Sequence, residues 1–216
     1  MIEAVIFDLY GTLIQVDCEM NPYLRFARLV CPKDPRSILR QSLLLNANGL
    51  GEFARHLNVT PPPSLQLLEY DLEREIQSAR LFEDVLETLT RLAARGLKLG
   101  LISNLATPYK EPFHRLGLAP YFQATLFSCD AGLRKPDAEL FLRMTQALGV
   151  SPANALMIGD NPRSDVAGAR CAGLAAILLQ RGTVCPIIDA IGGLRNLCET
   201  IRLTGDVVPL NSQPLQ

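Results

Sequence analysis

Five short apolar runs, each about as long as a β-strand, constrain the fold of this chain more than any other feature. The runs lie at 4–7, 97–102, 124–127, 155–158 and 175–179, and helix-period segments at 108–116, 137–148 and 164–172 separate the later ones. Strands that are apolar on both faces and alternate with helices are typical of a parallel sheet with helices on each side. The sequence therefore predicts an α/β fold built on a doubly wound parallel sheet.

The interval between the first two runs is too long for a single crossover. About ninety residues separate Asp8 from the run at 97–102, whereas a crossover between parallel strands needs only about a dozen or slightly more. Helical segments within this interval lie at 21–30, 35–46, 52–56, 64–78 and 84–95. We therefore expect a helical subdomain inserted into the core. The predicted divisions are 1–14 and 81–204 for the core, 15–80 for the insert, a final helix at 185–201 and a loose tail at 205–216.

The composition narrows the class of protein. The 216 residues are 48% hydrophobic and 20% charged, as in globular chains, and their net charge of −1 gives no electrostatic reason to expect nucleic acid as a partner. No apolar stretch approaches the roughly 20 residues that span a bilayer, and the first residues lack the pattern of a signal peptide. We expect a cytoplasmic protein, monomeric or homodimeric, that acts on a small molecule without a membrane or nucleic-acid partner.

Polar residues follow four of the apolar runs, at the point where each predicted strand ends. They are Asp8, Tyr10 and Thr12 after the first run, Ser103 and Asn104 after the second, Lys135 after the third, and Asp160 and Asp165 after the fourth. Each alone has an ordinary explanation as a turn, a cap or a solvated charge. Because the carboxyl ends of parallel strands meet at one edge, where ligands bind, the whole set predicts a functional site.

The types of these residues predict a particular chemistry. The Asp8 carboxylate can attack an electrophile and form an acyl intermediate that water later hydrolyses. Asp8 and Asp160 together can hold Mg²⁺, which prefers oxygen ligands and would lessen the repulsion between an anionic substrate and an anionic nucleophile. Ser103 and Lys135 can donate to oxygens on which negative charge develops. Asp165 can orient the waters of the metal.

Four segments in these positions are similar, in chain order, to the motifs of a known superfamily. The segments are Phe7-Asp8-x-Tyr10-Gly11-Thr12-Leu13, Ile102-Ser103-Asn104, Arg134-Lys135-Pro136-Asp137 and Ile158-Gly159-Asp160-x4-Asp165. Together they resemble the haloacid dehalogenase superfamily over about 4–182. The resemblance implies a Rossmann-like core with a helical cap inserted after the first motif. The polar residues of the expected cap, as candidates for substrate selection, are Tyr23, Arg25, Arg28, Arg40, Asn46, Asn48 and His56.

The resemblance also implies roles for individual residues. Asp8 matches the nucleophile, and Lys135 matches the residue that stabilises the charge of the transferred group. Thr12 and Ser103 match residues that bind this group, and Asn104 lies beside them in the second motif.

The metal site implied by the resemblance takes its ligands from the first and fourth motifs. Asp160 matches a metal ligand and Asp165 its companion acid, next to Asp8. The main-chain carbonyl of Tyr10 can serve as a further ligand, whatever side chain this position carries.

Tyr10 departs from the pattern of the phosphatases, which carry a second aspartate there to protonate the leaving group. A tyrosine with a pKa of about 10 is a poor general base at neutral pH, and general acid–base catalysis contributes about 10²–10⁴ in rate. The sequence Asp-x-Tyr-Gly-Thr is similar to the first motif of the 2-haloacid dehalogenases, which displace halide without a metal.

The fourth motif favours the phosphatase branch. Without a cation, a further carboxylate facing Asp8 would raise the pKa of Asp8 and neutralise the nucleophile. Asp160 therefore favours Mg²⁺ and an anionic substrate, and we predict hydrolysis of a small phosphate monoester through an aspartyl-phosphate. Three alternatives stay open: a 2-haloacid dehalogenase, phosphonate cleavage or phosphoryl transfer, and a catalytically weak binding or regulatory protein.

Overall fold

A computed structural model describes residues 1–182, 190–191, 193–194, 197 and 201, and it confirms the predicted α/β fold. Within these residues one sheet has the strand order β5-β4-β1-β6-β7-β8, and every neighbouring pair is parallel. The strands are β1 (Ala4–Phe7), β4 (Lys98–Ser103), β5 (Ala124–Phe127), β6 (Ala155–Gly159), β7 (Ala175–Leu179) and β8 (Ala190–Ile191). The five predicted runs therefore form five of the strands, with bounds that agree to within one residue.

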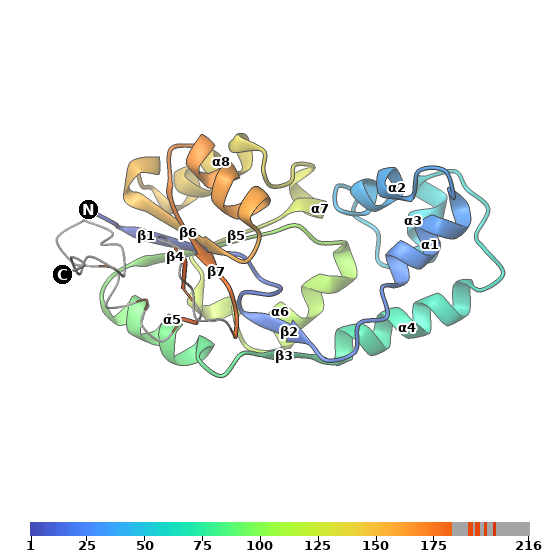
Figure 1. Cartoon of the computed structure of the whole chain (residues 1–216), viewed down its shortest axis with the longest axis horizontal. Coiled ribbons are helices and arrows are strands. Elements are labelled where there is room, and N and C mark those ends of the chain that lie inside the picture. Colours follow the sequence, from blue (N-terminus) through green and yellow to red (C-terminus); the bar gives the residue numbers. More distant parts are fainter. Residues whose placement is uncertain (183–189, 192, 195–196, 198–200, 202–216) are drawn as a thin grey trace, which may run out of the picture.

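Helices cover both faces of this sheet (Figure 1). These helices are α5 (Val85–Ala94), α6 (Glu111–Arg115), α8 (Ala138–Leu148) and α9 (Gly168–Cys171). Successive side chains of a strand point to opposite faces. Accordingly Ala4 and Ile6 pack in the apolar cluster under α8 and α9, whereas Val5 and Phe7 pack in the cluster under α5 and α6. All four residues of β1 are fully buried, so this strand is the centre of a doubly wound core.

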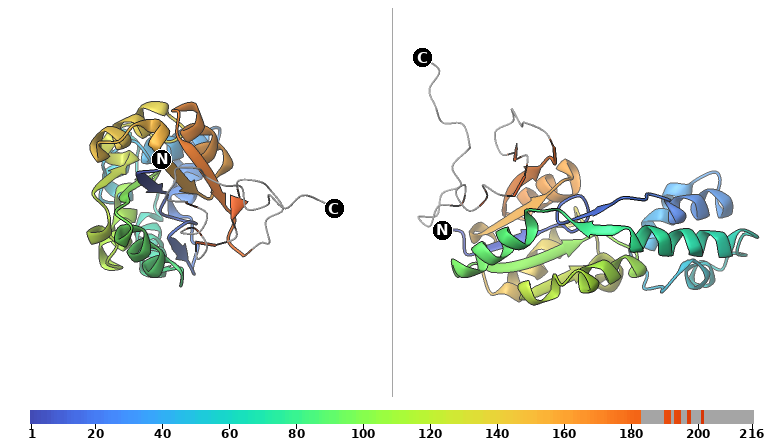
Figure 2. Two further views of the ribbon diagram at one scale, coloured as in Figure 1. Left: turned by 90° about the vertical axis from the view of Figure 1, so that its left-hand side faces the viewer. Right: turned by 90° about the horizontal axis from the view of Figure 1, so that it is seen from below.

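Four further helices form a helical lobe beyond one end of the sheet (Figures 1 and 2). They are α1 (Pro22–Val30), α2 (Pro35–Ser42), α3 (Leu50–His56) and α4 (Leu65–Gln77). The lobe encloses an apolar cluster of its own, in which Phe26 and Phe53 are almost completely buried. The N-terminus of the chain lies at the opposite end of the sheet from this lobe.

A two-stranded antiparallel ribbon connects the lobe to the core, and the sequence did not predict it. It consists of β2 (Ile14–Val16) and β3 (Ala79–Leu81), in which Ile14 pairs with Leu81. Each strand is too short to produce an apolar alternation, and the pairing joins residues far apart in the chain. The ribbon contains both crossings between core and lobe, and the expected divisions at 14/15 and 80/81 fall within it.

Proline explains one difference between the predicted and observed helices. The predicted helix at 108–116 is a 3₁₀ turn (Thr107–Lys110) followed by α6, because Pro108 and Pro112 have no amide hydrogen to donate to a continuous α-helix. The predicted helix at 164–172 begins as a π-helical segment (Pro162–Ala167) and continues as α9.

The predicted final helix at 185–201 is wrong at Ala190–Ile191. These two residues form β8, which pairs with Leu178 and Leu179 of β7 and so provides hydrogen-bond partners for the backbone at that edge of the sheet. Most of the remaining predicted helix and the whole tail at 205–216 lie outside the described residues. No helix in the described part of the chain has the length and apolar character needed to cross a membrane.

Candidate active site

The carboxyl edge of the sheet carries the predicted polar residues. Strand β1 lies between β4 and β6, so the chain extends the sheet in both directions from β1, and such a switch point is where ligands bind in open α/β sheets. A pocket of about 460 Å³ opens at this point. Its lining comprises Asp8, Tyr10, Arg40, Ser103, Asn104, Arg134, Lys135, Pro136, Asp160, Asn161, Arg163, Ser164 and Asp165. Seven of the eight predicted site residues therefore line one pocket, which we call the first pocket.

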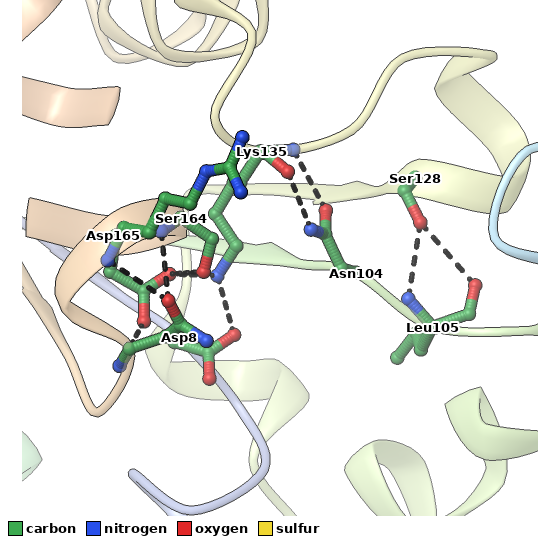
Figure 3. A network of polar contacts seen from close by, with 9 residues as sticks. Asp8, Asn104, Leu105, Ser128, Lys135, Ser164 and Asp165 are labelled. Atoms are coloured by element: carbon green, nitrogen blue, oxygen red, sulfur yellow. Dashed lines mark hydrogen bonds and ion pairs between the residues drawn. The ribbon is translucent and has the colours of Figure 1, made fainter. Parts of the chain in front are cut away.

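A buried carboxylate–ammonium–carboxylate triad lies in this pocket (Figure 3). Lys135 Nζ lies 2.6 Å from Asp8 Oδ1 and 2.7 Å from Asp165 Oδ1. The exposed fractions of Asp8, Lys135 and Asp165 are 7%, 2% and 1%, so water screens these charges poorly. One ammonium thus neutralises only part of the charge of its two carboxylate partners.

The electrostatics of the pocket follow from this burial. Burial raises the pKa of Asp8 to about 6; Lys135 counteracts the rise, and Asp165 and Asp160 add to it. Burial alone would lower the pKa of Lys135, but the combined effect of Asp8 and Asp165 raises it above its ordinary value. Burial, followed by the charge of Asp165, also raises the pKa of Asp160. A further positive charge would therefore relieve repulsion among these carboxylates.

Asp8, Asp160 and Asp165 form a donor set that fits a divalent cation. Each offers one carboxylate oxygen, and these oxygens lie within 4.8 Å of one another. Two glycines permit this approach, because a Cβ at Gly11 or at Gly159 would lie 2.3 Å from Oδ2 of Asp160 or Asp165, respectively. A cluster made only of oxygen donors, with excess negative charge, suits Mg²⁺.

Asn104 holds the segment that carries Lys135. Its amide nitrogen donates to the Lys135 carbonyl and its amide oxygen accepts from the Lys135 amide, both at 2.8 Å (Figure 3). Asn104 therefore lines the pocket with its side chain already engaged. Ser103, the last residue of β4, lines the same pocket and is 2% exposed.

Tyr10 and Thr12 are placed differently from the other predicted residues. The Tyr10 hydroxyl donates to the main-chain carbonyl of Tyr109 at 2.9 Å, and burial raises the pKa of Tyr10 above its usual value. Thr12 is completely buried and does not line the first pocket, and its Oγ1 has no hydrogen-bond partner among the described residues. Its carbonyl accepts a hydrogen bond from Arg181.

Three arginines line the first pocket in addition to the predicted residues at the strand ends. Arg40 comes from α2 of the helical lobe, Arg134 precedes Lys135, and Arg163 lies in the π-helical segment that follows β6. Arg40 was only one of several polar candidates in the insert, and Arg163 was interpreted as a solvated charge. No local pattern separates such arginines from ordinary surface residues; the adjacency of Arg134 to Lys135 was the one available signal.

The doubly wound sheet and the carboxylate cluster at its switch point define an α/β enzyme centred on a buried aspartate. The chain belongs to the haloacid dehalogenase-like hydrolase family, whose profile matches residues 2–173. The resemblance inferred from the four motifs is thereby confirmed.

Individual relatives agree with this assignment. The chain is 39% identical to a phosphoserine phosphatase from Thermus thermophilus over 110 residues, which cover 50% of this chain and 44% of that protein. The chain spans about half the length of the curated relatives it matches.

Solved structures share the fold. A HAD phosphatase from Thermococcus onnurineus matches with a TM-score of 0.65 at 24% identity, over 96% of this chain and 100% of that one. A 2-haloacid dehalogenase from Pseudomonas syringae matches with a TM-score of 0.61 at 25% identity, over 92% and 97%. Proteins named for both chemistries are therefore similar to this chain in fold.

Gly159, at the end of β6, provides a test of the carboxylate cluster. An added Cβ would lie 2.4 Å from Cγ of Asp165, whose buried side chain has little room to shift. We expect Gly159→Ala to lower the free energy of unfolding by about 1–3 kcal/mol and to weaken divalent-cation binding, as measured by urea denaturation and calorimetry. Gly51→Ala is the matched control, because its Cβ would meet its nearest neighbour at 3.6 Å. Native cation binding by Gly159→Ala would contradict the packing argument.

Proposed function

We propose that this chain is a Mg²⁺-dependent hydrolase of small phosphate monoesters that acts through an aspartyl-phosphate on Asp8. The main observation behind this proposal is the cluster of three carboxylate oxygens within 4.8 Å of one another, in a pocket that also contains one lysine and three arginines. Such a site combines the ligands of a hard cation with donors for an anionic group. The relatives that match about half of this chain are named as phosphatases, and these names support the same chemistry.

In the proposed first step, a carboxylate oxygen of Asp8 attacks phosphorus in line with the bond to the leaving group. Lys135 holds Asp8 Oδ1 at 2.6 Å and so fixes the orientation of the nucleophile. Arg134 and Arg163, with Lys135, neutralise the phosphoryl oxygens. In the second step water attacks the same phosphorus and releases the Asp8 carboxylate.

The metal would be held by Asp8, Asp160 and Asp165 together with the main-chain carbonyl of Tyr10. Bound Mg²⁺ supplies Lewis-acid stabilisation of charge on the phosphoryl group and lowers the repulsion between this group and Asp8. We expected both Thr12 and Ser103 to contact the transferred group. In this proposal Ser103 keeps that role and Thr12 does not. Ser103 lines the pocket and can donate to phosphate, whereas the buried Thr12 supports the loop that follows Asp8.

We assign 15–80 as the cap of the enzyme and 1–14 with 81–204 as its catalytic core. The separate apolar cluster of the helical lobe supports this division, as does Arg40, which extends from α2 to the pocket in the core. In this arrangement the helical lobe contacts the substrate from the side of the first pocket that faces away from the sheet.

A 2-haloacid dehalogenase is the second candidate function. Tyr10 favours it, because halide leaves carbon without a proton, and the similarity to the P. syringae dehalogenase is consistent with it. Asp160 and Asp165 disfavour it. Without a cation, the charges of these two carboxylates raise the pKa of Asp8 and so disfavour its ionised, nucleophilic form.

The proposed function is tested by hydrolysis of 4-nitrophenyl phosphate with Mg²⁺, after removal of metal by a chelator, and after Mg²⁺ is restored. We expect activity only with the metal and one Mg²⁺ site by calorimetry, weakened in Asp160→Asn. The matched Asp34→Asn variant, changed at the exposed N-cap of α2, should bind Mg²⁺ normally, since Asn is as good a cap as Asp. Halide release from 2-chloropropionate without metal, and no phosphatase activity, would support the dehalogenase instead.

A further inference from the structure

A second pocket adjoins the first between the core and the helical lobe. Its volume is about 690 Å³, and Tyr10 and Asn104 line both pockets. The two pockets therefore meet at these residues, and a substrate with its phosphoryl group at Asp8 can extend its other end into the second pocket.

Apolar and aromatic residues make up most of the lining of the second pocket. It includes the rings of Tyr10, Tyr23 and Tyr109, together with Leu39 of α2 and Leu43, which directly follows α2. Tyr109 packs against both other rings, with centroid distances of 5.8 Å to Tyr10 and 6.1 Å to Tyr23. Apolar cavities of about 150 Å³ already admit a benzene ring, so the second pocket has room for a substituted ring.

The charges of the two pockets differ in sign and in number. The first pocket contains four cationic side chains, those of Arg40, Arg134, Arg163 and Lys135, beside its three aspartates, whereas the described residues that line the second include no lysine or arginine. The second pocket contains two glutamates instead, Glu19 and Glu75. It therefore disfavours a second phosphate or a carboxylate on the leaving group.

The two residues shared by the pockets, Tyr10 and Asn104, are already hydrogen-bonded. The single hydroxyl proton of Tyr10 is donated to the Tyr109 carbonyl, and the Asn104 amide donates to the Lys135 carbonyl. The hydroxyl of Tyr23 in the second pocket has no hydrogen-bond partner among the described residues, but burial raises the pKa of Tyr23, so it is a weak acid towards a leaving group. Glu75 accepts hydrogen bonds from the amides of Met20 and Asn21 and from the Tyr109 hydroxyl, so both of its carboxyl oxygens act as acceptors in these contacts.

We propose that the second pocket receives the leaving group and that the substrates are phosphate monoesters of phenols. This inference rests on the proposed phosphatase function and specifies the substrate of the same site. The aromatic lining binds the ring, and a phenolate leaves without protonation by the enzyme because the ring delocalises its charge.

The bonds and protons of the proposed step balance. The Asp8 oxygen forms a bond to phosphorus while the bond from phosphorus to the phenolic oxygen breaks, and its electron pair departs with the phenolate. Water then attacks the aspartyl-phosphate, and the electron pair of the broken bond returns to Asp8. Of the two water protons, one stays on the released phosphate and the other reaches the phenolate through solvent.

The proposal has two parts: the second pocket binds a ring, and the leaving group departs without protonation by the enzyme. Four substrates test them separately: 4-nitrophenyl phosphate, 2-phenylethyl phosphate, acetyl phosphate and phosphoglycolate. The first two carry a ring but differ in the basicity of the leaving oxygen; acetyl phosphate has a weakly basic leaving group without a ring. With Mg²⁺ present, we expect kcat/KM for 4-nitrophenyl phosphate to exceed that for 2-phenylethyl phosphate by at least about 10²-fold. A family phosphatase with aspartate at the position of Tyr10 serves as the control and should show a smaller ratio.

Variants in the second pocket test where the ring binds. Leu43→Asn is expected to raise KM for 4-nitrophenyl phosphate about tenfold and to leave the KM for acetyl phosphate unchanged. Glu19→Gln is expected to leave the ratio of the two ring substrates unchanged. A ratio that increases in Glu19→Gln would identify Glu19 as a proton donor and overturn the proposal.

The outcomes also distinguish this inference from the proposed function. Hydrolysis of 2-phenylethyl phosphate or phosphoglycolate as efficient as that of 4-nitrophenyl phosphate would keep the phosphatase function and overturn the substrate class. Equal effects of Leu43→Asn on 4-nitrophenyl phosphate and acetyl phosphate would exclude the second pocket as the ring site. No hydrolysis of any of the four would overturn the phosphatase function itself.

Discussion

The Asp8→Asn variant is expected to lose at least about 10⁴-fold in kcat for phosphate-monoester hydrolysis, because an amide cannot form the aspartyl-phosphate. The fold should persist. Burial raises the pKa of Asp8 to about 6, so the folded protein already disfavours the charged form, and a neutral side chain of the same shape costs little at pH 7. Steady-state kinetics with 4-nitrophenyl phosphate and a urea unfolding curve measure the two effects.

A trapped intermediate gives an independent check of the covalent role. Native protein quenched in acid during turnover should gain the mass of one phosphoryl group on the peptide that contains Asp8, and Asp8→Asn should not. Asp34→Asn, which makes the same chemical change at the exposed N-cap of α2, should retain native kinetics. Near-native turnover by Asp8→Asn would exclude the covalent mechanism.

Replacement of Lys135 by methionine is expected to reduce stability and activity together. Lys135 is 2% exposed and pairs with Asp8 and Asp165 at 2.6 and 2.7 Å. Its removal leaves two buried carboxylates face to face, and loss of one partner of a buried ion pair costs about 3–5 kcal/mol. Loss of a donor to the phosphoryl group should lower kcat by at least about 10²-fold. Urea denaturation and kinetics at pH 8 measure the two losses.

The stability deficit of Lys135→Met should depend on pH. The pKa of Asp8 is about 6 even with the ammonium present, and without it the pKa rises further. A carboxyl with a raised pKa in the folded state binds its proton more tightly there than in the unfolded chain. The deficit should therefore shrink as the pH falls from 8 towards about 6, where Asp8 of the variant is protonated and native Asp8 is not, and should change little below about 6, where both are protonated.

The control for this variant is Lys33→Met, changed at an exposed lysine, which is expected to alter the free energy of unfolding by at most about 0.5 kcal/mol. Equal stability of native protein and Lys135→Met at pH 8 would contradict the proposed charge balance of the triad.

Local patterns in the sequence predicted most of the core. The bounds of β1, β5 and β7 agree with the predicted runs. The clearest case is β1, because a strand buried on both faces needs a continuous apolar segment that the sequence displays directly. The rule that strand ends converge then predicted that Asp8, Lys135 and Asp160 lie in one pocket, and they do.

Features that depend on distant segments were not predictable. The pairing of Ile14 with Leu81 and the strand at Ala190–Ile191 involve two or three residues each, too few for a periodic pattern. The same limit applies to Tyr10, whose hydroxyl partner Tyr109 lies 99 residues further along the chain.

The sequence by itself determined five strands of the central sheet, the helices that alternate with them, the family and most of the residues at the carboxyl edge, because these depend on local hydrophobic periodicity and residue type. Only the tertiary structure decided which of those residues have free polar atoms. Tertiary packing places Thr12 away from the first pocket, gives the amide of Asn104 a hydrogen-bond partner and brings Arg40 of the lobe to the site. Such contacts are made between segments far apart in the chain, and their distances follow from how the lobe and the core pack together.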